Sequence, residues 1–99
     1  MAMDVTVADN PDAARYEITV DGEGAGFVTY RQSPGVITFL HAEVHPSRER
    51  RGLGSQLVRG ALDDARARGL TVRPVCPFVA WFIETHEDYQ DLLGGPVNQ

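Results

Sequence analysis

The sequence predicts an α+β protein in which one mixed, mostly antiparallel sheet is combined with one long helix and short C-terminal helices. Two observations lead to this prediction. The first half of the chain consists of β-rich runs separated by glycine-bearing turns, and from Leu53 onward the apolar residues recur with a helical period. Because 99 residues suffice for one hydrophobic core, residues 1–99 are expected to form a single domain.

β-branched and aromatic residues predict the strands of the N-terminal half. The predicted strands cover residues 4–8, 15–20, 25–30 and 36–44. Turns at residues 21–24 and 32–35 connect the second strand to the third and the third to the fourth. Pro46 ends the fourth strand, because proline cannot donate a ladder hydrogen bond. Successive strands joined in this way are expected to form an antiparallel meander.

The second half begins with an amphipathic helix. Its apolar stripe comprises Leu53, Leu57, Val58, Ala61, Leu62 and Ala65. Gly69 is a natural stop, and Arg66 and Arg68 suit the partial negative charge of a helix C-terminus. A fifth strand is predicted at residues 70–76, followed by short helical segments that start at Pro77. The side chains expected to pack and cover these segments are Trp81, Phe82, Tyr89 and Leu92.

The charge balance argues against nucleic acid as a partner. The formal net charge is −5, from 14 acidic and 9 basic residues, and every basic residue is arginine. An acidic chain is poorly suited to neutralising the phosphates of nucleic acid, whereas it can attract a cationic amine. Four of the arginines are nevertheless concentrated near one loop, namely Arg48, Arg50, Arg51 and Arg59. This local positive charge suits one small polyanion.

Neither a membrane segment nor a metal or disulfide framework is predicted. No apolar stretch is long enough to span a bilayer and nothing resembles a signal peptide, so the expected location is the cytoplasm and no membrane partner is expected. The single cysteine, Cys76, excludes an internal disulfide and forms no usual zinc-ligand spacing with the three histidines.

The clearest chemical signal joins the fourth strand to the long helix. Residues 47–55 contain Gly52 and Gly54 and run directly into the helix. Free N–H groups at a helix start carry partial positive charge, and glycine lets a ligand approach the backbone, so this loop can cradle a pyrophosphate. The alternative is that the glycines only turn the chain, and the pattern alone leaves both interpretations open. Rossmann and Walker loops fit less well, since Leu57 occupies the third Rossmann glycine position and no Lys-Ser/Thr pair follows Gly54.

Two segments resemble the GCN5-related N-acetyltransferase (GNAT) family. The first is Glu43-Val44-His45-Pro46 followed by Arg50-Arg51-Gly52-Leu53-Gly54-Ser55-Gln56-Leu57, which is similar to the family's acetyl-CoA-binding motif. The second is Pro74-Val75-Cys76-Pro77-Phe78-Val79 with His86-Glu87-Asp88-Tyr89 and Asp91-Leu92, which is similar to the C-terminal signature of the short single-domain subfamily. The chain departs from the family at Glu49, where glutamine or arginine is usual, and at Arg50, where glycine is common. Phe78 and Phe82 stand near positions where close relatives often have tyrosine.

The resemblance implies a minimal fold in which the fourth strand splays from the fifth, with acetyl-CoA or coenzyme A as cosubstrate and no metal. The pantetheine arm is expected to lie in the gap, beside the backbone of Glu43 and Val44. The residues expected to bind the coenzyme are Val44, Arg50, Arg51, Gly52, Leu53, Gly54 and Ser55. The acetyl thioester is expected near Cys76.

Three residues are candidates for the chemistry: His41, Glu43 and Cys76. His41 and Glu43 are two residues apart on one strand and share a face, where His41 can act as a base or water relay and Glu43 can accept a proton through water. Their alternatives are an exposed sheet histidine and a solvated or arginine-paired carboxylate. Cys76 can line the acetyl end of the ligand or act as a nucleophile, and its alternative is a small buried apolar side chain. The resemblance favours direct transfer, with Cys76 lining the site.

The function implied by the resemblance is the transfer of acetyl from acetyl-CoA to an unidentified small-molecule or protein amine. The alternative from another class is a coenzyme A-binding module without catalysis, such as a sensor or partner-binding domain. A small nucleic-acid-binding domain is disfavoured by the acidic charge. Nothing in the sequence specifies the oligomeric state, and a monomer or weak homodimer is expected.

Overall fold

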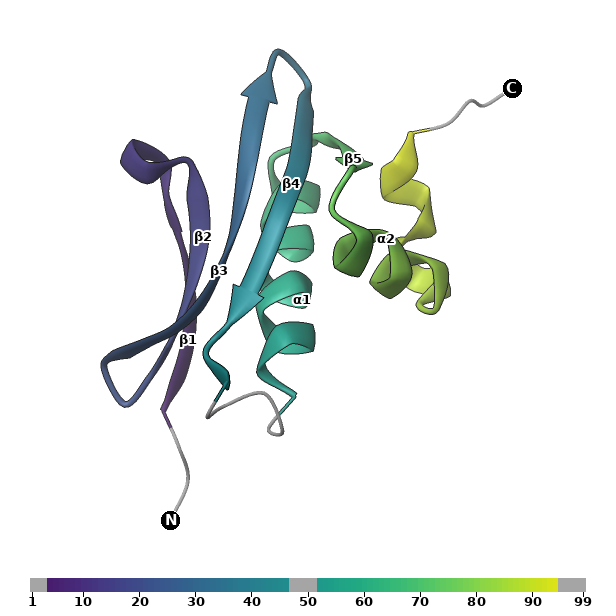
Figure 1. The fold of residues 1–99 in the computed structure, drawn as a ribbon. Coiled ribbons are helices and arrows are strands. Elements are labelled where there is room, and N and C mark those ends of the chain that lie inside the picture. The colour runs from purple at the N-terminus through teal and green to yellow at the C-terminus, as the bar shows by residue number, and fades with distance from the viewer. Residues whose placement is uncertain (1–3, 47–51, 95–99) are drawn as a thin grey trace.

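The computed structural model describes residues 4–46 and 52–94, which form one five-stranded sheet with helices (Figure 1). The strands, in spatial as well as chain order, are β1 (Val5–Asn10), β2 (Arg15–Val20), β3 (Glu23–Ser33), β4 (Val36–Val44) and β5 (Thr71–Pro74). The helices are α1 (Leu53–Ala67) and α2 (Pro77–Glu84), with two 3-10 segments, η1 (Pro11–Ala13) and η3 (Glu87–Leu93). The predicted α+β class and the predicted order of the main elements are confirmed. None of the helices in residues 4–46 and 52–94 is long and apolar enough to cross a membrane.

The sheet is mixed, as predicted. The first four strands form an antiparallel meander, whereas β5 pairs parallel to β4. The parallel pairing follows from α1, because a helical crossover between two strands brings the chain back in the same direction. The core lies between α1 and one face of the sheet, and all six residues of the predicted apolar stripe of α1 are buried. In the part of the chain that the structure describes, the opposite face of the sheet carries no helix (Figure 1).

β1 extends to Asn10, two residues beyond its predicted end, and β3 and β5 differ from their predicted bounds for local reasons. β3 is longer than the predicted strand at residues 25–30 and leaves only Asp21 and Gly22 in the turn. Both residues have positive φ angles, 51° and 84°, as in the two-residue hairpin turns whose twist matches that of the flanking strands. β5 is shorter than the predicted strand at residues 70–76, because Cys76 is already the N-cap of α2 and a proline occupies the first turn of that helix.

A β-bulge at Leu40 changes which side chains of β4 face the helices. Tyr30 pairs with Phe39 and Thr29 pairs with His41, so Leu40 has no partner in the ladder with β3. An extra residue reverses the alternation of side chains beyond it. Phe39 is therefore buried in the core while His41, two residues later, is exposed on the other face.

The fourth and fifth strands separate beyond Phe39. Their parallel ladder ends at the pair Phe39 and Pro74, and the backbone N–H of Cys76 donates a final hydrogen bond to the Phe39 carbonyl over 2.8 Å. Residues 40–44 of β4 then continue without a β5 partner, because the chain after Cys76 turns into α2. The splayed pair expected from the sequence is confirmed, and it opens a gap between the end of β4 and the two helices.

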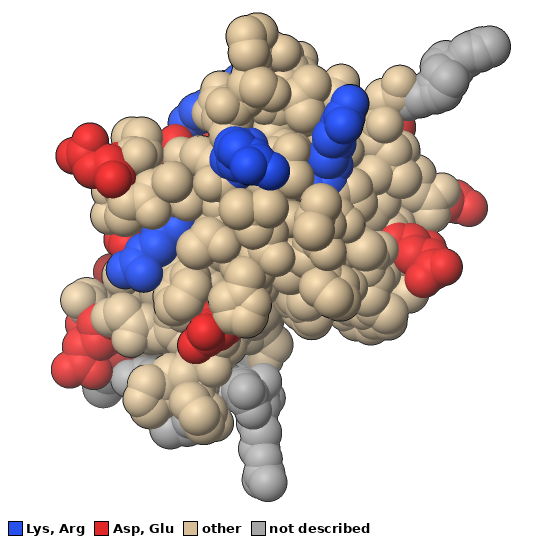
Figure 2. Space-filling view, turned by 45° about the horizontal axis from the view of Figure 1, so that its top comes forward, with Lys and Arg blue, Asp and Glu red and all other residues tan. Residues whose placement is uncertain are grey.

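Charged side chains are dispersed over the face of the molecule seen in Figure 2. Arginine side chains lie mainly in the upper part of this view and at its left edge, where they adjoin acidic ones, and the acidic side chains lie mainly towards the outline. The face shown has no continuous basic stripe among the described residues. An electrostatic footprint for nucleic acid would require such a stripe, so this face offers no support for that function.

Candidate functional site

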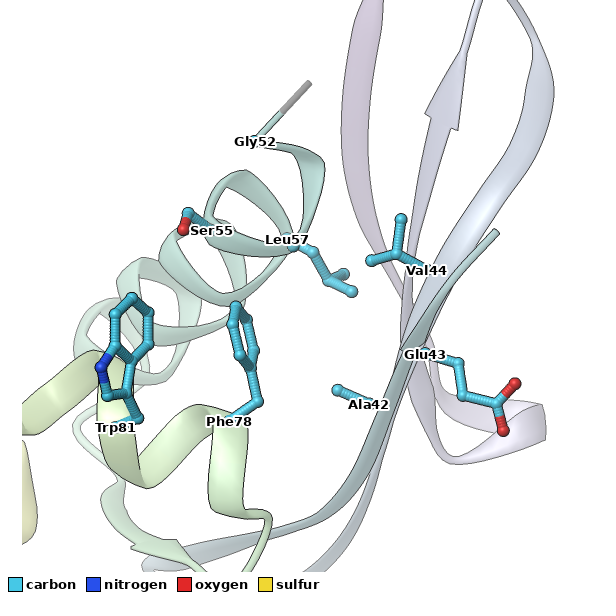
Figure 3. A pocket seen from close by; sticks show the side chains of 9 residues that line it. Ala42, Glu43, Val44, Gly52, Ser55, Leu57, Phe78 and Trp81 are labelled. Carbon is cyan, nitrogen blue, oxygen red and sulfur yellow. The ribbon is translucent and has the colours of Figure 1, made fainter. Parts of the chain in front are cut away.

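A pocket of about 400 Å³ lies where β4 has separated from β5 (Figure 3). It is bounded by the end of β4 and by the first turns of α1 and α2. The lining residues are Ala42, Glu43, Val44, Gly52, Gly54, Ser55, Leu57, Phe78 and Trp81. The bulge at Leu40 creates the floor, because it turns Ala42 and Val44 towards α1, where Leu57 meets them (Figure 3).

The α1 end of the pocket presents polar backbone groups. Gly52 is the N-cap of α1 and has a φ of 66°, a left-handed conformation that residues with a side chain adopt at a cost. Among the described residues no side chain caps this helix end, and its first turn contains no acidic residue, so the N–H groups of the first turn are not neutralised by the helix itself. The partial positive charge of these groups favours an anion at this end of the pocket.

Gly54 keeps the pocket open between the two helices. A Cβ atom at this position would lie 3.1 Å from Cζ of Phe78 and 3.6 Å from Cγ2 of Val44. The first of these distances is tighter than ordinary van der Waals contact, so Phe78 would have to shift. A larger side chain at residue 54 would therefore fill space that a ligand could use.

The coenzyme-binding residues expected from the sequence divide into three groups. Val44, Gly52, Gly54 and Ser55 line the pocket. Leu53 is fully buried in the core, so only its backbone is available to a ligand. Arg50 and Arg51 lie outside the described residues.

An aromatic wall on α2 was not predicted to be part of the site. Phe78 and Trp81 stack with ring centroids 5.6 Å apart and an interplanar angle of 26°. Both line the pocket, and the Trp81 side chain stays 49% exposed although the sequence suggested a packing role for it. The available signal was their spacing of three residues directly after Pro77, which places both on one face of a helix that starts beside the loop. Phe82, Tyr89 and Leu92 are buried, as predicted.

His41 and Glu43 are hydrogen-bonded to each other on the open face of the sheet. Nε2 of His41 lies 2.8 Å from Oε2 of Glu43, and both side chains are about three-fifths exposed, at 61% and 62%. In Figure 3 the Glu43 side chain points away from the pocket, so this residue contributes to the pocket through its backbone. The Phe27 ring lies 6.4 Å from the His41 ring, and the Arg15 guanidinium lies 4.7 Å above the centroid of Phe27.

A second, shallow hollow of about 410 Å³ lies on this open face. Arg15, Glu17 and Phe27 line it together with the glycine-bearing start of β3. Glu43 and Val44 line both this hollow and the pocket beside α1. The end of β4 therefore separates two concave surfaces, one on each side of the strand.

Cys76 lies at the base of the splay but does not line the pocket. Its side chain is 2% exposed and belongs to the hydrophobic core. Its backbone joins β4 to α2, since its N–H donates to Phe39 and its carbonyl accepts from the N–H of Ala80 over 3.0 Å. This placement matches the buried alternative left open by the sequence, and the predicted contact with the acetyl group stays a prediction. Within the described part of the chain, no group of three or more His, Cys, Asp or Glu side chains is arranged to hold a metal ion.

A mixed sheet that splays beside a glycine-capped helix defines the structural class of this protein, and comparisons with known proteins agree with it. A family model described as GCN5-related N-acetyl-transferase matches residues 15–92. The chain therefore belongs to the GCN5-related N-acetyltransferase family and is an acetyltransferase by class. No curated protein matches the sequence significantly.

Two solved structures share the fold. A protein of Staphylococcus aureus described as GCN5-like, known from an NMR solution structure, superposes with a TM-score of 0.68 at 21% identity and covers 95% of this chain and 89% of its own. A ribosomal-protein-alanine N-acetyltransferase from Brucella melitensis biovar Abortus 2308 superposes with a TM-score of 0.57 at 19% identity, covering 93% of this chain and 88% of its own. At these identities the likeness establishes the fold alone.

Proposed function

We propose that this chain is an acetyl-CoA-dependent N-acetyltransferase that transfers acetyl directly to an amine. The observation that carries the proposal is the pocket between the free end of β4 and the start of α1, where the N-cap residue is a glycine without a side chain to bind the N–H groups. The pocket has an apolar trough and an end that favours an anion. Coenzyme A has a long neutral arm, which suits the trough, and a pyrophosphate, which suits the other end. The cytoplasm remains the proposed location.

Each part of the pocket has a stated role in this proposal. The N–H groups from Gly52 to Ser55 would bind the pyrophosphate, because they are the free donors of the helix start. Ala42 and Leu57 would contact the pantetheine arm, and the unpaired edge of β4 would hydrogen-bond its amides. Phe78 and Trp81 would cover the arm and exclude water. When bound, acetyl-CoA would supply the activated acetyl group.

The His41–Glu43 pair would handle the proton of the acceptor. Acetyl transfer forms a carbon–nitrogen bond as the carbon–sulfur bond breaks, so one proton must leave the amine nitrogen and the departing thiol must be protonated. Glu43 would accept the amine proton, directly or through water, while the hydrogen bond from His41 orients its carboxylate, and the departing thiolate would take its proton from solvent water. The amine would approach from the open face and reach the thioester through the gap beyond Phe39, where β4 has no β5 partner.

The open face suits a cationic acceptor. Glu17 and Glu43 both line the hollow there. The hydrogen bond from Arg15, and next that from Asn10, hold the pKa of Glu17 below its usual value, so this carboxylate stays ionised at neutral pH. We propose a small-molecule or protein amine as the acceptor, since a protonated amine is attracted to such a surface before it is deprotonated for the reaction.

Turnover with a panel of amines tests the catalytic part of the proposal. Release of the coenzyme A thiol would be measured with polyamines, amino acids and lysine-containing peptides. With the best acceptor, Glu43→Gln is expected to lower kcat roughly 100-fold, the lower range for loss of a general base. Glu87→Gln, which removes an exposed carboxylate on η3, is the matched control and should leave kcat unchanged.

One observation favours a coenzyme-binding module without catalysis. The side chains of His41 and Glu43 lie on the face opposite the pocket and are largely exposed. If this alternative is correct, the protein binds acetyl-CoA, no amine in the panel is acetylated, and Glu43→Gln changes nothing. A reduced kcat in Glu43→Gln with unchanged coenzyme affinity would exclude it.

A further inference from the structure

Arg59 stands one helical turn beyond the rim of the pocket. It follows the pocket residue Ser55 by four positions on α1, so the two side chains lie on the same face of that helix, about 6 Å apart along its axis. On α2, Phe82 follows the pocket residue Phe78 by the same four positions. The Arg59 guanidinium lies 5.4 Å from the centroid of the Phe82 ring, which brings the two helices together at this level.

The Arg59 guanidinium is positioned by aromatic rings and keeps its charge available. It lies 5.6 Å from the centroid of Tyr89, and its Nη1–H reaches the Tyr89 hydroxyl over a long 3.4 Å. The Tyr89 hydroxyl itself donates to Oδ1 of Asp63 on α1 over 2.8 Å. Among residues 4–46 and 52–94, Arg59 forms no ion pair with a carboxylate.

Arg66 provides a direct contrast on the same helix. It also lies over Tyr89, at 5.8 Å, but both of its terminal nitrogens bind Asp91, at 2.7 and 3.0 Å. Arg66 thus has a structural partner for its charge, whereas Arg59 is an exposed cation whose one side-chain hydrogen bond within residues 4–46 and 52–94 is the long contact to Tyr89. Two arginines over one ring therefore differ in whether they can bind an external anion.

We propose that Arg59 binds the 3′-phosphate of the coenzyme A ribose and makes the site prefer coenzyme A to its 3′-dephospho form. The inference rests on the proposed function, because it places the pyrophosphate at the start of α1. Coenzyme A carries a second phosphate group on the ribose next to that pyrophosphate, and this group needs a cation of its own. Arg59 offers a planar set of donors one turn further along the same helix, held in place before the ligand arrives.

The test compares two ligands on three proteins by isothermal titration calorimetry. Coenzyme A and 3′-dephospho-coenzyme A are titrated into the wild-type chain, Arg59→Gln and Arg66→Gln. The wild type should bind coenzyme A roughly tenfold more tightly, the effect of one charge-assisted hydrogen bond. Arg59→Gln should lose that preference while binding the dephospho ligand as before, and Arg66→Gln should keep it.

The other outcomes overturn the inference in distinguishable ways. Equal binding of both ligands by the wild type would refute the role of Arg59 and leave the proposed function standing. Equal weakening of both ligands in Arg59→Gln would mean that the residue only supports the fold. Binding of neither ligand by the wild type would refute the inference and the proposed function together.

Discussion

At the scale of single residues, two tyrosine hydroxyls connect the sheet to the end of α1. The hydroxyl of Tyr16 donates to Asp64, and that of Tyr30 donates to Asp9 over 2.6 Å. Arg68 joins the two carboxylates, at 2.7 Å from Asp9 and 2.9 Å from Asp64. These charge-assisted hydrogen bonds connect the strands to the C-terminal end of α1, away from the pocket, and fix the position of the helix on the sheet.

These tyrosines predict how stability depends on alkaline pH. Burial, and next the hydrogen bond to Asp9, raise the pKa of Tyr30 to about 12, and burial with the bond to Asp64 raises that of Tyr16. A tyrosine with a raised pKa stabilises the fold fully below its unfolded pKa of about 10, and this stabilisation is lost as the pH rises through the folded value. The free energy of unfolding should therefore fall between pH 10 and 12.

Chemical denaturation at a series of pH values checks this prediction. Tyr30→Phe removes one of the titrating groups, so its stability should fall less steeply than that of the wild type in the same pH window. At neutral pH the variant should be less stable by about 1 kcal/mol, the usual contribution of one hydrogen bond. An unchanged slope above pH 10 would show that Tyr30 titrates as freely in the folded protein as in the unfolded one.

At the scale of secondary-structure elements, the sequence predicted the strands and α1 because their apolar residues repeat with the right period. It did not predict the bulge at Leu40. Continued alternation from Phe39 would have placed His41 and Glu43 in the core, and the pairing with β3 reverses that order. A bulge depends on register with the neighbouring strand, which a single sequence does not reveal. The role of Trp81 in the pocket could not be predicted for the same reason, since the other lining residues come largely from β4 and α1.

The contact between α1 and β1 gives a prediction at this scale. A Cβ atom at Gly60 would lie 2.8 Å from Cγ1 of Val7, closer than side chains normally approach. Gly60→Ala should gain about 1 kcal/mol of helix propensity but lose about 1–3 kcal/mol through overpacking, for a net loss of roughly 1 kcal/mol. Urea denaturation of the variant and the wild type would measure this difference in the free energy of unfolding.

The control for Gly60→Ala is the same change in a Val7→Ala background. Val7→Ala removes both γ-carbons that a methyl group at residue 60 would meet but keeps the Cβ atom, which lies 2.9 Å away, so Gly60→Ala should be less destabilising in this background than in the wild type. Equal effects in the two backgrounds would show that the helix and strand adjust freely and that the close approach is not what selects glycine.

At the scale of the whole molecule, the fold places its pocket where the sheet comes apart. β1, β2 and most of β3 form a paired support, while the free end of β4 and the first turns of α1 and α2 supply every lining residue of the pocket. The α1 side of this pocket could be predicted from the sequence, because glycines and a helix start are local features. The α2 wall and the open face required the three-dimensional arrangement.

Binding of acetyl-CoA in this pocket can be measured directly by titration. Trp81 is the single tryptophan of the chain and lines the pocket, so its fluorescence can be followed alongside calorimetry. We predict saturable one-to-one binding of acetyl-CoA that changes the Trp81 emission. Gly54→Leu, which fills the space beside Phe78, should abolish binding, whereas Gly24→Leu, which adds the same side chain beside the open-face hollow, should not. No binding at millimolar acetyl-CoA, or unchanged binding in Gly54→Leu, would contradict the account.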